Sequence, residues 1–286
     1  MKSQWDCLRE NLGEWHGSFT QVSPDGQELK DTPSVLVLAE DDAAQTIRLV
    51  LTRSPVDGPA NEMVRSFSYP GPGDKVPFFE TGAFTQGSLQ WAPFGQFGAE
   101  LALTSGKRRL RLVQLFEGTV DGKSLLKSIT LIRETLAGHS DPPSPDLTVD
   151  ALVGHWVGKA VTMYASGADP TSMSTDLKIA VDDDRLTQST TFGGGADEVR
   201  TVESSGRIEG NSLWFDSNEG KNQLSYRVLM LPGGGSVVVP TAIERDRPFL
   251  LEAGWMVTPT YRQRMIRQYN ERGEWMNVTL VEEYRQ

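Results

Sequence analysis

The sequence has little of several residue types on which protein function commonly depends. It contains one cysteine, Cys7, so an intrachain disulfide bond is excluded and a reducing compartment is favoured. Its three histidines lie in no zinc-binding motif, and we expect no metal site. No apolar run approaches the roughly 18 residues of a membrane span, and the first residues form no hydrophobic signal segment. These absences predict a cytoplasmic protein without a membrane span.

Basic residues are also scarce relative to acidic ones. The chain has 28 lysines and arginines against 38 aspartates and glutamates, which gives a formal net charge of −10. An acidic surface repels phosphate backbones, so we expect no nucleic-acid partner. The hydrophobic fraction of 38% is typical of a globular protein, and 286 residues suffice for about two domains.

What the sequence does contain is an internal repeat. Gly13–Trp15, which reads Gly-Glu-Trp, returns as Gly154–Trp156, which reads Gly-His-Trp. Four further pairs of segments recur in the same order: Ser34–Leu38 with Leu177–Val181, Gly82–Trp91 with Gly206–Trp214, Arg109–Phe116 with Arg262–Tyr269, and Ile129–Glu134 with Val278–Glu283. A period of roughly 140 residues far exceeds the periods of solenoid repeats. It predicts two like-folded domains, residues 1–138 and 146–286, joined by a proline-rich and therefore stiff linker at 139–145.

Short strand-like segments alternate with turn residues along most of the chain. In the first half the expected strands are Val35–Leu38, Thr46–Leu51, Val64–Ser68, Ser88–Trp91, Glu100–Leu103, Leu110–Phe116 and Lys127–Ile132. So many short strands in roughly 140 residues predict an all-β fold, either a closed barrel or a sandwich. Helix is expected at Trp5–Leu12, with Ser3 as N-cap, and at Asp146–Leu152.

A short helix followed by Gly-x-Trp on the first strand resembles the signature of lipocalins and the wider calycin group. The resemblance implies two tandem antiparallel calycin-like β-barrels with short N-terminal helices. It also implies that Trp15 and Trp156 are structural plugs at the closed ends of the barrels, where a large aromatic side chain buries much apolar area. In that group a charged side chain of the final strand packs over the tryptophan. The residues here that could do so are Arg133 or Glu134 in the first half, and Glu282 or Glu283 in the second.

The second half carries a further resemblance. Trp255–Arg264, followed by a strand that ends at Thr279–Glu283, resembles the C-terminal part of S-type phycobilin lyases, which are cytosolic calycin barrels that attach linear tetrapyrroles to light-harvesting proteins. The layout of the whole chain resembles an uncharacterised tandem-calycin family of cyanobacteria and plastids. These resemblances imply a bilin or another hydrophobic pigment as the bound molecule, with no cofactor required, and a phycobiliprotein-type acceptor as a partner.

The candidate ligand-binding residues are aromatic and basic side chains of the second half. Arg262 and Arg264 lie two residues apart on a predicted strand and therefore share a face, as do Arg109 and Arg111. If that face lines the barrel, each pair could bind a carboxylate bidentately; the alternative is a solvated outer face. Tryptophans near these strands could line a pocket wall or belong to the core. The candidate set is Trp214, Trp255, Arg262, Arg264, Arg267 and Tyr269.

Glu283 is the candidate catalytic residue. A carboxyl group in a barrel mouth could position or protonate a pyrrole nitrogen if burial raises its pKa. The alternative is a glutamate at the rim of the barrel or paired with an arginine.

Three functions remain open from the sequence. The favoured one is binding of a hydrophobic, carboxylate-bearing small ligand, a tetrapyrrole-type pigment. The second is an enzyme that acts on such a pigment, either a chromophore lyase or an isomerase. The third is a scaffold or assembly factor whose barrels are filled by side chains.

Overall fold

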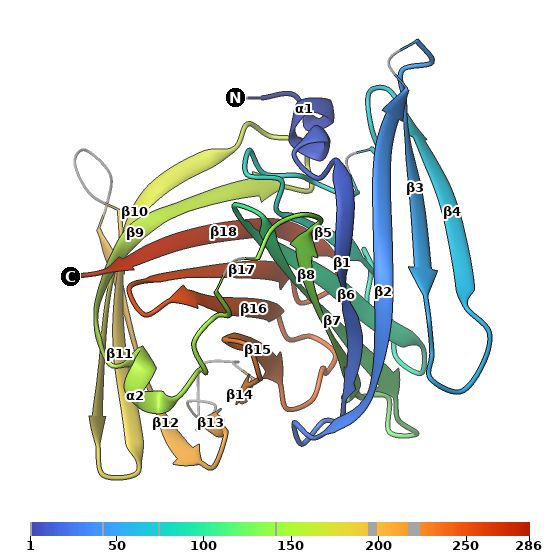
Figure 1. The fold of residues 1–286 in the computed structure, drawn as a ribbon. Helices are drawn as coiled ribbons and strands as arrows, with labels where there is room; N and C mark the ends of the chain where they lie inside the picture. Colours follow the sequence, from blue (N-terminus) through green and yellow to red (C-terminus); the bar gives the residue numbers. More distant parts are fainter. Residues whose placement is uncertain (1, 42, 74, 141, 194–198, 217–223) are drawn as a thin grey trace. The chain divides into compact units, whose positions relative to one another are not determined.

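The chain folds into two compact units of antiparallel strands (Figure 1). The computed structural model describes residues 2–41, 43–73, 75–140, 142–193, 199–216 and 224–286. The first unit comprises residues 1–87, 98–115 and 127–142, and the second comprises residues 88–97, 116–126 and 143–286. The linear domain boundaries given above stay a prediction. Neither helix of the described residues is long and apolar enough to cross a membrane.

The first eight strands form one open up-and-down sheet in the order β4-β3-β2-β1-β8-β7-β6-β5. Ser3 caps the helix that precedes them, as predicted, because its side chain accepts a hydrogen bond from the Asp6 backbone N–H. Trp5 and Leu8 of that helix are buried in the core of the first unit. The elements are α1 (Gln4–Arg9), β1 (Gly13–Val22), β2 (Glu28–Asp41), β3 (Thr46–Arg53), β4 (Asn61–Ser68), β5 (Phe84–Gly87), β6 (Gln96–Ser105), β7 (Arg108–Gly118) and β8 (Ser124–Leu136).

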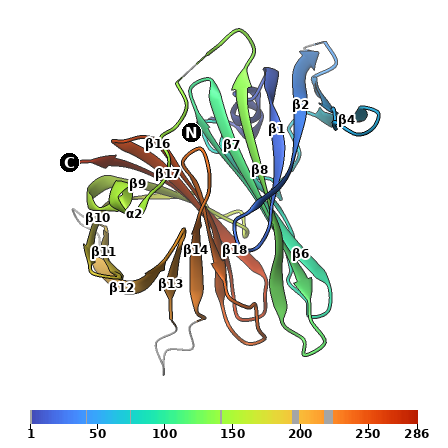
Figure 2. The same cartoon turned by 60° about the horizontal axis from the view of Figure 1, so that its bottom comes forward.

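The remaining ten strands form a closed barrel, which can be followed in Figure 2. Each strand pairs with the next in sequence, and β18 pairs with β9 to close the ring. A short helix precedes β9, as α1 precedes β1. The elements are α2 (Val149–Leu152), β9 (Gly154–Tyr164), β10 (Thr171–Asp182), β11 (Arg185–Phe192), β12 (Arg200–Glu209), β13 (Ser212–Phe215), β14 (Tyr226–Met230), β15 (Gly235–Pro240), β16 (Phe249–Thr258), β17 (Tyr261–Tyr269) and β18 (Trp275–Arg285).

The all-β prediction is confirmed, with one difference between the halves: the first sheet is open, whereas the second is closed. The predicted strand Ser88–Trp91 does not form. Its backbone pairs instead with the turn before β18 and with the first residue of β18, because Trp91 N–H donates to the Gly273 carbonyl and Trp275 N–H donates to the Leu89 carbonyl. Among its described residues, the first half also has no strands equivalent to β14 and β15 of the second half.

Two equivalent glycines allow the first and last strands of each repeat to approach closely. Gly17 on β1 lies opposite Glu134 on β8, and Gly158 on β9 lies opposite Glu283 on β18. A Cβ atom on Gly17 would lie 1.9 Å from the Arg133 carbonyl oxygen, and one on Gly158 would lie 2.0 Å from that of Glu282. No side chain fits between these strands without moving the backbone.

We therefore expect Gly158→Ala to destabilise the second unit by about 3 kcal/mol, the range for overpacking in a region that cannot relax. Urea unfolding followed by circular dichroism measures the loss. Gly95→Ala is the matched control, because its new Cβ would lie at an ordinary distance of 3.6 Å from the nearest atom. Equal unfolding midpoints for the two variants would contradict the close approach of β9 and β18.

Candidate functional site

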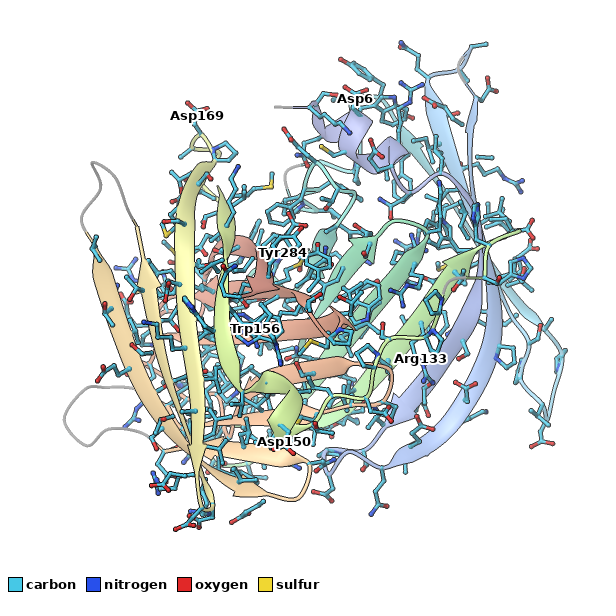
Figure 3. The ribbon with its side chains drawn as sticks, turned by 60° about the vertical axis from the view of Figure 1, so that its left-hand side comes forward. Asp6, Arg133, Asp150, Trp156, Asp169 and Tyr284 are labelled. Carbon is cyan, nitrogen blue, oxygen red and sulfur yellow. The ribbon has the colours of Figure 1, made fainter. Side chains whose placement is uncertain are left out.

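Each unit contains one buried tryptophan at the start of its first strand. The indole N–H of Trp15 donates to the Asn11 carbonyl oxygen at 2.9 Å, and that of Trp156 donates to the Leu152 carbonyl oxygen at 2.9 Å. Figure 3 shows Trp156 on β9, close to the end of α2. Trp156 thus bonds to the last residue of α2, whereas Trp15 bonds to the turn that follows α1, and a plugging role for either ring stays a prediction.

A buried arginine–glutamate cluster, the first cluster, lies against Trp15. It consists of Glu100, Arg109, Arg111 and Glu134, from β6, β7 and β8. The Arg109 guanidinium carbon lies 4.4 Å from the centre of the Trp15 ring. Glu134 accepts from Arg109 Nε at 2.7 Å and from Arg111 Nε at 3.0 Å, and Arg111 Nη1 also donates to Glu100 at 2.6 Å.

The second cluster, Glu252, Arg262, Arg264 and Glu283, repeats this arrangement beside Trp156. The Arg262 guanidinium carbon lies 4.7 Å from the centre of the Trp156 ring. Glu283 accepts from Arg262 Nε at 2.7 Å and from Arg264 Nη2 at 3.0 Å. Glu252 lies 3.5 Å from Arg264 Nη1. The two halves thus share a set of interactions as well as a fold.

The strand register places the second cluster inside the barrel. Arg262 lies opposite Glu283, Arg264 lies opposite Val281, and Gly158 lies opposite Glu283 on the other side of β18. These residues share a face with Trp156, because side chains alternate between the two faces of a strand. Of the two orientations that the sequence left open for the arginine pair, the inward one is observed.

The inward arginines already have carboxylate partners within the chain. Burial alone would raise the pKa of Glu283, but the charges of Arg264 and Arg262 outweigh it and lower that pKa to about 2. In the first cluster Arg111 and Arg109 likewise outweigh burial and lower the pKa of Glu134 to about 2. A carboxylate held in this way is ionised at neutral pH and has no proton to donate. This geometry favours a structural charge partner over the general acid that was predicted at Glu283.

Glu252 differs from Glu283. Burial raises the pKa of Glu252, and the more distant Arg264 and Arg262 only partly offset the effect. Sequence reasoning missed Glu252 and its counterpart Glu100. The available signal was position: a glutamate precedes the arginine pair by nine residues in the first half, from 100 to 109, and by ten in the second, from 252 to 262.

The other candidate residues are not part of this cluster. The indole N–H of Trp255 donates to Ser144 Oγ at 2.9 Å, and the ring of Trp214 lies 4.9 Å from the Arg227 guanidinium carbon. Arg267 donates to the Tyr269 hydroxyl at 2.7 Å. By strand alternation, Trp255 and Arg267 lie on the face opposite Arg262 and Arg264, whereas Tyr269, at the end of β17, lines the same cavity as the two arginines. The predicted set is therefore divided between two faces of the barrel, and a ligand-binding role for its members stays a prediction.

The closed barrel contains a cavity of about 2640 Å³. Arg262, Arg264 and Glu252 form part of its wall, so the second cluster is accessible from the interior. Apolar side chains cover much of the remainder, among them Leu177, Leu186, Leu213, Phe215, Val228 and Val281. The volume is larger than that of a typical small-molecule pocket. Space therefore remains among the described side chains that line the barrel.

Comparison with known proteins agrees with the repeated architecture. Residues 1–139 match the family model of the N-terminal domain of a family of unknown function, DUF3598. A crystal structure of a DUF3598 protein of unknown function from Nostoc punctiforme is 44% identical, covers 100% of both chains and superposes with a TM-score of 0.89. The chain belongs to the DUF3598 family. Residues 143–286 of this DUF3598 protein match the family model of the C-terminal domain of biogenesis factor required for ATP synthase 1.

A more distant similarity involves a smaller protein. The S-type phycobiliprotein lyase of Guillardia theta is 16% identical, and the match covers 48% of this chain and 90% of the lyase with a TM-score of 0.40. No functionally curated protein matches the sequence.

The second cluster predicts a large effect of one substitution. Glu283→Gln removes the carboxylate between two buried guanidinium groups, and we expect it to destabilise the second unit by about 4 kcal/mol. Thermal unfolding measures the change. Glu282→Gln is the matched control, because Glu282 lies on the opposite face and accepts a hydrogen bond from the Tyr261 hydroxyl; it should lose about 1 kcal/mol. A Glu283→Gln variant as stable as Glu282→Gln would show that the cluster does not hold the barrel together.

The lowered pKa values of Glu134 and Glu283 also predict acid sensitivity. A carboxyl group with a lower pKa in the folded protein stabilises the fold above its unfolded pKa, and that contribution is lost as the pH falls through the folded pKa. Each glutamate should therefore contribute about 3 kcal/mol that disappears as the pH falls from 4.5 toward 2. Urea unfolding at a series of pH values measures this slope, which should become shallower in Glu134→Gln and Glu283→Gln. An unchanged slope in both variants would refute the assignment.

Proposed function

We propose that this protein is an assembly factor that acts in the biogenesis of ATP synthase. The observation that carries the proposal is the match of residues 143–286, the whole of the closed barrel, to the C-terminal domain of a biogenesis factor required for ATP synthase. The chemistry of the clusters is consistent with such a role. Their arginines are neutralised within the chain, and Glu283 is held ionised, as expected for groups that fix a scaffold.

Deletion of the protein in its native host tests this proposal. Membranes of the deletion strain should contain less assembled ATP synthase on native gels and show a matching loss of ATPase activity, while synthesis of the individual subunits continues. The full-length chain should restore both. Another membrane complex, measured in the same samples, is the control. A normal amount of ATP synthase in the deletion strain would reject the assembly role.

A second candidate function is binding of a hydrophobic, carboxylate-bearing ligand in the closed barrel, with a tetrapyrrole-type pigment as that ligand. The cavity supports it, since about 2640 Å³ of interior with largely apolar walls can hold an extended molecule. Arg262 and Arg264 line this cavity, and they are the groups of its wall that a carboxylate on the ligand would meet. Enzymatic action on the pigment has weaker support, because Glu283 has no proton to donate at neutral pH.

Titration with bilins, haem, carotenoids and fatty acids tests the ligand proposal. Binding of the pigments should change their absorbance, and fatty acids should compete with them. Thr190→Trp narrows the cavity, since Thr190 lies opposite the inward Leu177, and should weaken binding at least five-fold. Thr191→Trp adds the same bulk on the opposite face of β11 and should leave the affinity unchanged. The proposal is lost if no ligand of the panel binds, or if the two variants behave alike.

A further inference from the structure

The open sheet of the first unit ends in an exposed edge strand. β4 pairs with β3, and among the described residues it has no second neighbouring strand (Figure 1). β4 is eight residues long, and most of its side chains are exposed. Such an edge is a template for pairing with another strand unless it is covered or blunted.

The backbone groups that point outward along this edge can be identified. Tyr69 N–H donates to the Gln45 carbonyl oxygen, just beyond the end of the β3–β4 ladder. Hydrogen-bonded and non-hydrogen-bonded pairs alternate in antiparallel strands. It follows that the backbones of the odd-numbered residues of β4 bond to β3. Those of Glu62, Val64 and Ser66 point away from β3 and are available to a new strand.

The second unit shows what occupies the equivalent edge there. β12 is the fourth strand of the closed barrel, as β4 is the fourth strand of the open sheet. β12 pairs with β13. The residues of β13 that contribute to the core of the second unit, Leu213 and Phe215, are apolar. In the first half the segment that corresponds to β13 in the repeat, Ser88–Trp91, forms no strand in the first sheet. The second half thus has a strand beside β12, whereas the described part of the first half has no strand at the corresponding position beside β4.

The charges beside the edge define what could take that position. Met63 and Phe67 of β4 pack on the core of the first unit, and Arg65 lies between them on the same face. Arg53, opposite Asn61 on β3, also lies on this face, with its guanidinium carbon 5.6 Å from the centre of the Phe19 ring. In the part of the chain that the structure describes, neither arginine forms an ion pair with a carboxylate. This is a basic and apolar strip in a protein whose net charge is −10.

We propose that the free edge of β4 binds an extended segment of a partner protein, which adds a strand carrying apolar residues opposite Met63 and Phe67 and a carboxylate opposite Arg65. Backbone hydrogen bonds to Glu62, Val64 and Ser66 supply affinity, and the side chains of the inner face supply specificity. Arg65 favours an acidic strand, because a glutamate opposite it on the added strand would form a cross-strand ion pair.

The probe is a synthetic, fluorescein-labelled heptapeptide in which threonines alternate with valine, glutamate and valine. Its pattern reads the same in both directions, so it can pair in either orientation. Fluorescence anisotropy with the full chain, up to millimolar protein, should show binding at least five-fold tighter than that of the same peptide with lysine in place of glutamate. Arg65→Glu should reverse this preference. Equal affinity for the two peptides, or no binding of the glutamate peptide, would overturn the proposal.

Two variants at one position test the edge itself. Ser66→Pro removes an outward N–H without removing a hydrogen bond to β3, so it should abolish binding, while Ser66→Ala keeps the N–H and should bind normally. Hydrogen exchange provides a readout on the unsubstituted chain: the amides of Glu62, Val64 and Ser66 should become protected when the glutamate peptide is present. The proposal is also overturned if these amides stay unprotected. It fails equally if sedimentation shows a dimer that Ser66→Pro disperses, since a second copy would then occupy the edge.

Discussion

The interaction on which both units depend is the contact of a tryptophan, two arginines and a glutamate that links the first strand to the last two. In the second unit, Trp156 lies on β9, Arg262 and Arg264 lie on β17, and Glu283 lies on β18. Gly158 is part of the same constraint, since it lies directly opposite Glu283 and has no side chain that would displace it. The Gly-x-Trp-x-Gly pattern of β9 therefore serves two purposes. Its tryptophan stacks on Arg262, and its last glycine leaves room for Glu283, the carboxylate that pairs with Arg262.

The physical value of such a cluster lies in specificity at least as much as in stability. Desolvation of two guanidinium groups and two carboxyl groups offsets much of their mutual attraction, and an apolar replacement of similar volume can be as stable. An apolar core, however, tolerates a strand that slips by two residues, whereas a buried arginine must meet its carboxylate. Because Glu134 and Glu283 each bind both arginines of their cluster, one register of the last two strands lets each of these glutamates pair with both arginines. This accounts for the near identity of the two clusters in halves that otherwise differ in strand number.

The repeat in the sequence was sufficient to predict the fold class, the short helices and the positions of both tryptophans. It was not sufficient to orient the arginine pairs. Alternation of polar and apolar residues shows which face of a strand is buried only when the other face is exposed. On β7 both faces are buried, since Arg109 is 2% exposed and its neighbour Leu110 is 1% exposed. The sequence was also not sufficient to predict that the first sheet is open. Ser88–Trp91 has the sequence of a strand, and its backbone partners, Gly273 and Trp275, lie about 180 residues away in the chain.

Duplication has thus preserved the constraint and changed what surrounds it. Both halves keep the tryptophan, the arginine pair and the glutamate, because loss of one member would leave a charge buried without its partner. The strands far from the cluster carry no such penalty. In the second half the additional strands β14 and β15 complete a ring around a cavity whose wall includes Arg264. In the first half the same position is an edge with outward backbone groups and an exposed Arg65 on the face that also carries Met63 and Phe67. Closing the sheet encloses space and leaves no strand edge, whereas leaving it open exposes an edge. The variable strands therefore determine whether a half offers an interior or an edge for binding, while the cluster holds the rest of each fold constant.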